Sequence, residues 1–334
     1  MKPAASGTHA RHRPAPATRE AQRGIALIVA ILLVALGTIL ASAIAYENAM
    51  TARRGSGTYA FDESILIAQG AEALAAYGIR QFFQGDPSHV YIGQGWDKPV
   101  GPMEVTPGVM LQASLEDLQG RFNLNNLVRN DGTPDPANVA AFTKLLELLG
   151  LETKWAPMMV DWIDTDIVPQ SIDGAEDSVY MGQAPPYRTA NRYITSASEL
   201  LALPGFGRDR YLLLAPYVTA LPYKTTINVC TARDKVLDAF LPPGQTDFSS
   251  TSGQLDKNRV QGSTGCFPTL ANYQAAFSDP KQWAAVQGKF GQTSVYFRLT
   301  SFITIGGAEF NLYSLLYRDA TGAVRPIQRS FTPD

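Results

Sequence analysis

The chain is poor in the residues that most often build enzyme centres. Its 334 residues include two cysteines, Cys230 and Cys266, and three histidines. Two of the histidines lie in the first 24 residues, so a cysteine–histidine nucleophile would have to depend on His89. An even pair of cysteines in an oxidising compartment is most simply a disulfide. That bond would close a loop of about 36 residues and contribute on the order of 4 kcal/mol to stability.

Charge is also scarce. Charged residues make up 17% of the chain, and the formal net charge is -2. Residues 1–24 hold five basic residues and one acidic residue, so the remainder of the chain is more acidic, with a net charge of about -6. Such a balance gives no general attraction to nucleic acid or to anionic lipid. No glycine-rich phosphate loop with its lysine occurs, so ATP-driven work would have to come from another protein.

One stretch lacks charge and proline altogether. Residues 25–45 are apolar, with nothing more polar than Thr38 and Ser42. As a helix, this run would span roughly the 30 Å hydrocarbon layer of a bilayer. The basic residues 1–24 precede it, and the positive-inside tendency keeps them in the cytoplasm and sends the bulk of the chain across. The run therefore predicts a single membrane-spanning helix.

The sequence around Gly24 has features that a plain membrane anchor does not need. A basic leader that ends in Gly24, followed by an apolar segment that stays helical, resembles the type IV prepilin class. The resemblance implies that a prepilin peptidase cuts between Gly24 and Ile25 and methylates the new N-terminus. Most of that class has Glu at the fifth mature position, which here is Val29. An ordinary single-pass anchor is the alternative interpretation.

The missing glutamate has a consequence for assembly. A carboxylate in lipid is costly unless it meets a cation, and in this class it is thought to meet the terminal amine of a neighbouring subunit. A subunit with Val29 does not need an earlier neighbour in order to join. This departure is the one expected of the first subunit, at the tip of a filament.

The remaining pattern predicts an α+β fold of the pilin type. Residues 46–84 continue the helix, with a weak point at residues 55–57 and an apolar stripe interrupted by Glu72, and the helix ends at residues 85–87. Residues 103–115 predict two strands about a Pro-Gly turn, and residues 294–318 predict a hairpin about Gly306-Gly307. A further strand follows residue 322. A long N-terminal helix packed on this antiparallel sheet, interrupted by a large helical insertion, is the predicted architecture.

The predicted boundaries follow from these elements. They are a cleaved leader at 1–24, an N-terminal helix at 25–85, a pilin-like domain at 86–120 and 290–334, and a mainly helical insertion at 121–289. Within the insertion a half-repeat is visible, in which a short strand with an Asn precedes a helix, at residues 120–149 and again at 225–241. The insertion is predicted to hold two such small helix-hairpin-helix-like modules.

The segment Leu203-Pro-Gly-Phe-Gly207 resembles the hairpin of helix-hairpin-helix DNA-binding modules. Backbone N–H groups of such hairpins hold a phosphate at a helix N-terminus. Arg208 and Arg210 follow it, but the neighbourhood is not basic overall, and phosphate binding needs neutralising cations. We interpret the segment as a packing turn, with phosphate binding as the alternative.

The strongest chemical cluster lies just upstream. Six carboxylates fall within 17 residues, and no basic residue occurs between Lys154 and Arg188. Their mutual repulsion would be relieved by a hard cation, and calcium suits an irregular, oxygen-rich loop. A solvated acidic loop and a carboxylate pair for hydrolysis are the alternatives. The predicted ligands are Asp164, Asp166, Glu176 and Asp177, then Asp173, whereas Asp161 faces the helix that carries Trp162.

Several motifs together resemble the K-type minor pseudopilin of type II secretion systems. They are residues 161–164 (Asp-Trp-Ile-Asp), 174–177 (Gly-Ala-Glu-Asp), 185–191 (Pro-Pro-Tyr-Arg-Thr-Ala-Asn) and 228–232 (Asn-Val-Cys-Thr-Ala). The resemblance implies a non-enzymatic subunit of a heterotrimeric tip made with other minor pseudopilins, which initiates pseudopilus assembly for protein export. It also implies one or two bound calcium ions.

The expected partners are those sibling pseudopilins, the prepilin peptidase and the inner-membrane assembly platform. The expected location is the inner membrane, with the bulk of the chain in the periplasm and no nucleic-acid partner. Two other classes stay open: a membrane-anchored DNA-uptake factor that uses the hairpin at 203–207, and an anchored hydrolase that uses the acidic loop.

Overall fold

A computed structural model describes residues 19–222, 224–250, 254–261 and 265–333. Most of the predicted leader, residues 1–18, lies outside this description. The chain divides into two compact units, Met1–Asp62 and Glu63–Asp334. Helix α1, Arg19–Gly85, contributes to both units and is continuous through the predicted weak point at residues 55–57.

In the first unit, none of the described residues covers the apolar run of α1. Every side chain from residue 24 to residue 49 is exposed. Among the described residues, one helix, Gly24–Gly85, is long and apolar enough to cross a membrane. The leader junction, Gly24 and Ile25, lies on this helix with both residues exposed.

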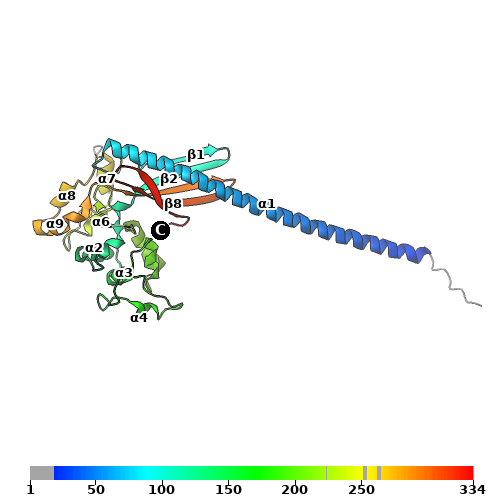
Figure 1. Cartoon of the computed structure of the whole chain (residues 1–334), viewed down its shortest axis with the longest axis horizontal. Coiled ribbons are helices and arrows are strands. Elements are labelled where there is room, and N and C mark those ends of the chain that lie inside the picture. The colour runs from blue at the N-terminus through cyan, green and yellow to red at the C-terminus, as the bar shows by residue number, and fades with distance from the viewer. Residues whose placement is uncertain (1–18, 223, 251–253, 262–264, 334) are drawn as a thin grey trace, which may run out of the picture. The chain divides into compact units, whose positions relative to one another are not determined.

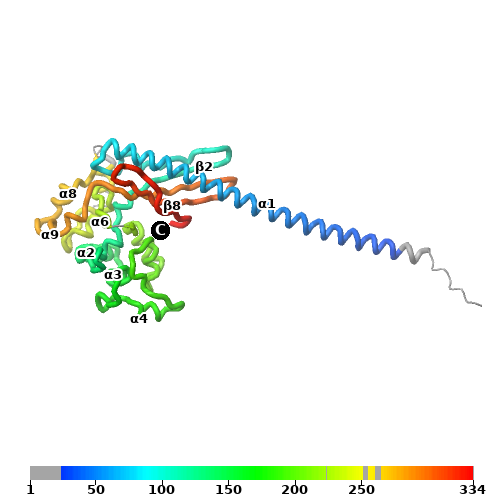
Figure 2. Tube along the Cα trace, viewed as in Figure 1, coloured from blue at the N-terminus to red at the C-terminus, as the bar shows by residue number. Residues whose placement is uncertain are grey.

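The second unit is built on a five-stranded antiparallel sheet with the order β1-β2-β7-β8-β9. Strands β1 (Val100–Thr106) and β2 (Val109–Asp117) form the hairpin predicted about the Pro-Gly turn. Strands β7 (Tyr296–Ile305) and β8 (Ala308–Arg318) meet at Gly306-Gly307, and β9 (Val324–Ser330) completes the meander. Figure 2 shows the N-terminal hairpin, in cyan, beside the C-terminal strands, in orange and red. The predicted sheet is confirmed.

The C-terminal part of α1 supplies the other half of this core. Ala68 and Ile79 are buried, at 1% and 3% exposure, and pack with Leu111, Phe297 and Leu316 of the sheet. The alternation of side chains along β7 turns Phe297 and every second residue after it toward α1. The apolar stripe expected on this helix therefore covers one face of the sheet.

The helical insertion lies between β2 and β7, which are neighbours in the sheet although far apart in sequence. It also contains two short parallel pairs, β3 with β4 and β5 with β6. Its elements are η1 (Leu118–Gly120), β3 (Phe122–Asn123), η2 (Leu124–Leu127), α2 (Pro136–Leu148), α3 (Trp155–Ile163), α4 (Asp177–Tyr180), η3 (Ala197–Ala202), α5 (Gly207–Leu214), η4 (Ala215–Tyr217), β4 (Val218–Thr219), β5 (Ile227–Asn228), α6 (Asp234–Asp238), α7 (Gln254–Gln261), α8 (Leu270–Ala275), α9 (Pro280–Val286), η5 (Gln287–Lys289) and β6 (Phe290–Gly291). Figure 1 shows α4 at the bottom of the view, away from the sheet.

The half-repeat read from the sequence corresponds to these parallel pairs. Asn123 ends β3, and its side chain accepts a hydrogen bond from the N–H of Asn125. Asn228 ends β5, and its side chain accepts one from the N–H of Cys230. In both places a short strand and an asparagine turn precede a helix, α2 or α6, although α6 ends at Asp238, earlier than expected.

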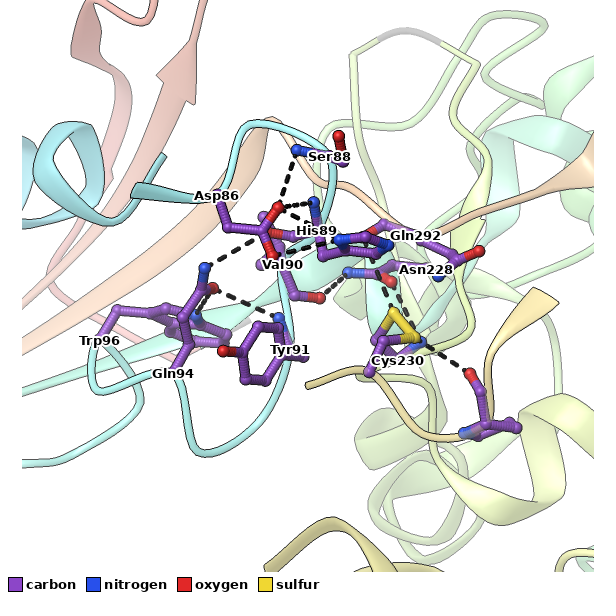
Figure 3. A network of polar contacts seen from close by, with 12 residues as sticks. Asp86, Ser88, His89, Val90, Tyr91, Gln94, Trp96, Asn228, Cys230 and Gln292 are labelled. Carbon is purple, nitrogen blue, oxygen red and sulfur yellow. Dashed lines mark hydrogen bonds and ion pairs between the residues drawn. A yellow bond between two sulfur atoms is a disulfide. The ribbon is translucent and has the colours of Figure 1, made fainter. Parts of the chain in front are cut away.

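Buried polar contacts join the insertion to the sheet. Asp117, at the end of β2, accepts hydrogen bonds from Asn228, Thr231 and Ser294. Asn228 also donates to the carbonyl of Val90, in the loop that follows α1 (Figure 3). Sheet and insertion therefore belong to one compact unit, because buried hydrogen bonds cross the boundary expected at residues 120–121.

Candidate metal centre

Three carboxylates of the acidic loop converge at the C-terminus of α3. Asp164 caps that helix, and its N–H donates to the carbonyl of Val160. Asp166 follows it, and Glu176 lies at the start of α4. One oxygen from each of the three side chains lies within 4.8 Å of the others. The structure thus brings together three of the five ligands predicted from the sequence.

Two of these carboxylates are buried without enough hydrogen-bond donors. Asp164 is 0% exposed and Glu176 is 3% exposed. The Oδ1 atom of Asp164 and both carboxylate oxygens of Glu176 have no hydrogen-bond partner among the described residues. An unsatisfied buried carboxylate is strongly unfavourable, so these oxygens call for a cation or a proton.

The pKa values of Asp164 and Glu176 also indicate that these carboxylates lack a positive partner. Burial, together with the charges of Asp166 and Asp161, raises the pKa of Asp164 to about 7. Burial and neighbouring carboxylates, Asp161 first, raise the pKa of Glu176 to about 7. Both pKa values rise because Asp164 and Glu176 are buried next to other carboxylates, and no cation of the described residues is among the groups that shift them.

The donor set fits calcium. Calcium takes six to eight oxygens at about 2.3–2.6 Å, so two of its ligands stand at most about 5 Å apart. The three converging oxygens lie within that span. Calcium also accepts neutral amide oxygens, and the Oδ1 atom of Asn191 is buried without a hydrogen-bond partner in the described part of the chain. The Nδ2 atom of Asn191 donates to the carbonyl of Asp166, at 3.2 Å.

Two predicted ligands lie outside the converging group. Asp177 accepts two hydrogen bonds from Thr189, and its other oxygen is 3.8 Å from the Arg188 guanidinium. Asp173 is exposed, on the turn before Gly174. Sequence spacing gave no way to separate these two from the other three, because the partner of Asp177 lies twelve residues further along the chain.

The surroundings of the acidic loop are packed core. Trp155 and Trp162 are 1% and 6% exposed, and Trp162 packs against Tyr180 and Tyr187. A glycosidase would need aromatic platforms open to a sugar. These two tryptophan rings instead belong to the buried core, where Trp155 also packs against Phe206.

The hairpin at residues 203–207 joins η3 to α5. Both of its glycines have positive φ, 82° at Gly205 and 75° at Gly207, which explains the need for glycine there. Arg210 donates to both carboxylate oxygens of Glu152 and to the carbonyl of Phe206. One of the two basic residues beside the hairpin is therefore neutralised within the protein.

The two cysteines are joined in the structure. Cys230 and Cys266 form a disulfide with their Cα atoms 4.7 Å apart. Cys230 follows β5, so the bond ties the segment before α8 to the buried junction shown in Figure 3.

Comparison with known proteins places the chain among secretion components. A family model described as type II secretion system (T2SS), protein K matches residues 120–223. The type II secretion system protein K of Pseudomonas aeruginosa is 31% identical over 327 residues, which cover 93% of this chain and 93% of the relative. The protein of the same name from Klebsiella pneumoniae is 33% identical over 314 residues, which cover 89% of this chain and 93% of the relative.

A solved structure shares the fold. The crystal structure of the GspK–GspI–GspJ complex from the enterotoxigenic Escherichia coli type 2 secretion system matches with a TM-score of 0.73 and 23% sequence identity. The match covers 84% of this chain and 100% of the matched chain. This agrees with the α+β pilin-like architecture described above.

Proposed function

The chain belongs to the type II secretion system protein K family, and from this premise we propose that it is the minor pseudopilin that forms the tip of the pseudopilus. There it initiates assembly with two other minor pseudopilins, for protein export across the outer membrane. Its role is structural and not catalytic.

Val29 is the observation that carries this proposal. It occupies the fifth position after the expected cleavage at Gly24, on a helix whose side chains are exposed from residue 24 to residue 49. In a filament whose other subunits bring a carboxylate there, each carboxylate must find a cation in the lipid. A subunit with valine at this position has no carboxylate that needs the cation of an earlier neighbour. It can therefore be the first subunit.

The insertion supports the same position. About half of the chain lies between β2 and β7, two strands that are direct neighbours in the sheet. A pilin-like domain that carries such added bulk is suited to end a stack of subunits, because a filament interior requires subunits that repeat closely. The tip imposes no such limit.

The location follows from the leader and the apolar helix. The basic residues 1–24 favour retention in the cytoplasm, and residues 25–45 span the inner membrane once. The compact unit Glu63–Asp334 then lies in the periplasm, where the Cys230–Cys266 disulfide is compatible with the redox conditions. The prepilin peptidase and the inner-membrane assembly platform are the remaining partners.

We also propose that Asp164, Asp166 and Glu176 hold one calcium ion. The unpartnered buried oxygens of Asp164 and Glu176 support this assignment. A bound calcium ion would supply the positive charge that this cluster lacks. The chain's own contribution is to hold the three carboxylates converging at the end of α3, so that the loop up to α4 keeps one conformation.

Co-purification tests the tip proposal. The full chain, extracted in detergent from cells that make the whole system, is expected to recover two other pilin-like subunits in one complex of equal stoichiometry, measured by native mass spectrometry. Cells without the chain are expected to form few or no pseudopili. Recovery of the chain without any pilin-like partner would contradict the proposal.

A further inference from the structure

Asp161 is a carboxylate of the acidic cluster whose position differs from that of the converging three. It lies on α3, one turn before Asp164, and is 0% exposed. Both of its oxygens are already used by backbone donors of the loop. Its Oδ1 accepts from the N–H of Gln170 at 3.0 Å, and its Oδ2 accepts from the N–H of Ala175 at 2.7 Å.

These two hydrogen bonds hold the loop at Ala175, next to Glu176, and at Gln170, which contacts Asp164. Ala175 directly precedes Glu176, so its N–H sets where the Glu176 side chain starts. Gln170 donates through its side-chain Nε2 to Oδ2 of Asp164, at 3.0 Å. One buried carboxylate therefore holds the backbone beside two of the three converging residues.

The backbone next to Asp161 is adapted to this contact. A Cβ atom on Gly174 would overlap Oδ2 of Asp161 and would also press on Pro169 and on the carbonyl of Ser171. Glycine at this position lets the chain approach the carboxylate closely enough for the Ala175 N–H to donate. Glycine at position 174 is therefore part of the same contact between the loop and Asp161.

We infer that Asp161 is a positioning residue for the metal centre: it holds residues 170–175 so that Glu176 and Asp164 face the same ion, without binding that ion itself. The inference rests on the proposed calcium site. Residues that orient metal ligands typically change affinity 10- to 100-fold when they are altered.

The test is calcium titration calorimetry of the full chain in detergent, at a temperature well below unfolding. Asp161→Asn keeps the size of the side chain but places an NH₂ group against one of the two backbone N–H groups, so one hydrogen bond must be lost. Calcium affinity is expected to fall 10- to 100-fold. Ile163→Val, a buried substitution on the same helix, should lower stability slightly and leave affinity within about twofold, because it touches neither loop bond.

Gly174→Ala is the second variant, and it decides the matter if Asp161→Asn does not fold. It displaces the loop from Asp161 and should also weaken calcium binding at least tenfold, with the ligands intact. Wild-type affinity in Asp161→Asn or Gly174→Ala would overturn the positioning role alone. Absence of calcium binding by the wild-type chain would overturn the metal centre and, with it, the role assigned to Asp161.

Discussion

Glu72 places a carboxylate inside the stripe by which α1 packs on the sheet. It is 4% exposed, and it accepts hydrogen bonds from Arg329 of β9 and from Ser314 of β8. Burial by itself raises the pKa of Glu72, but the hydrogen bonds and the charge of Arg329 outweigh it and bring the pKa below its ordinary value. The stripe is therefore interrupted without a loss of packing.

Removal of Arg329 is expected to destabilise the second unit. In Arg329→Met the Glu72 carboxylate would stay buried with only Ser314 as a donor, at a cost of about 2–4 kcal/mol. Chemical denaturation of the full chain in detergent measures this. Arg325→Met is the matched control on the same edge strand, because Arg325 lies over the Tyr317 ring and not against Glu72, and it should change stability by less than about 0.5 kcal/mol. Equal effects of the two variants would contradict the role of the ion pair.

The raised pKa values of Asp164 and Glu176 predict how the free energy of unfolding of the metal-free chain depends on pH. Their pKa values in the folded state, about 7, lie above their ordinary values of 3.8 and 4.5. Between about pH 4 and pH 7 the folded state therefore binds more protons than the unfolded state. The free energy of unfolding should fall as pH rises through this window and level off above it.

Calcium should reverse that trend, because it binds the deprotonated carboxylates. At 100 times its Kd, calcium is expected to add about 2.7 kcal/mol, or roughly 5–10 °C in Tm, at pH 8, and much less at pH 5. Thermal unfolding with calcium or with a chelator measures the difference. Asp164→Asn should abolish it, and a wild-type chain with the same Tm in both buffers at pH 8 would exclude the metal.

Single side chains were the hardest part to predict from sequence. The acidic loop was visible because its residues are close in the chain, and three of its five expected ligands converge. The partner of Glu72 lies 257 residues away, so no local pattern could identify Arg329. The role of Asp161 depends on two backbone N–H groups, and these carry no sequence signal at all.

At the scale of elements, sequence reasoning succeeded where the signal is local. The hairpin about Gly306-Gly307 combines a turn that requires positive φ with flanking β-rich runs, and both glycines do have positive φ. The end of α1 at Gly85 was equally clear. For the two-residue strands, the sequence indicated short strands near β3 and β5 but not their pairing with β4 and β6, because each partner lies far along the chain.

The hairpin between η3 and α5 gives a prediction at this scale. Arg210 pairs with Glu152 and holds the carbonyl of Phe206, so we expect a packing turn and no phosphate site. Arg210→Ala should lower the free energy of unfolding only slightly, because solvent screens the ion pair and the hairpin loses one donor to the carbonyl of Phe206. Arg208→Ala, on an exposed side chain, should have no effect.

A gel shift with duplex DNA at low salt checks the alternative for the same hairpin. The wild-type chain and both arginine variants are expected to leave the DNA unshifted. A shift by the wild-type chain that is lost in Arg208→Ala would favour nucleic-acid binding instead.

At the scale of the whole molecule, the sequence predicted a pilin-like sheet interrupted by an insertion, and the structure contains both. The expected division at residues 120–121 does not mark a separate body, because Asp117 and Asn228 join the two parts through buried hydrogen bonds. The other division, between Asp62 and Glu63, falls within α1. The filament-tip account therefore depends most on what happens at the start of that helix.

Mass spectrometry of the N-terminus tests this account most directly. The chain is purified from the inner membrane of cells that make the prepilin peptidase, and its terminal peptide is sequenced. We expect it to begin with a methylated Ile25, and we expect a Gly24→Leu variant to keep its leader. A wild-type chain that still begins at Met1 would contradict the account, because an uncleaved leader keeps the helix as a plain anchor and out of a filament.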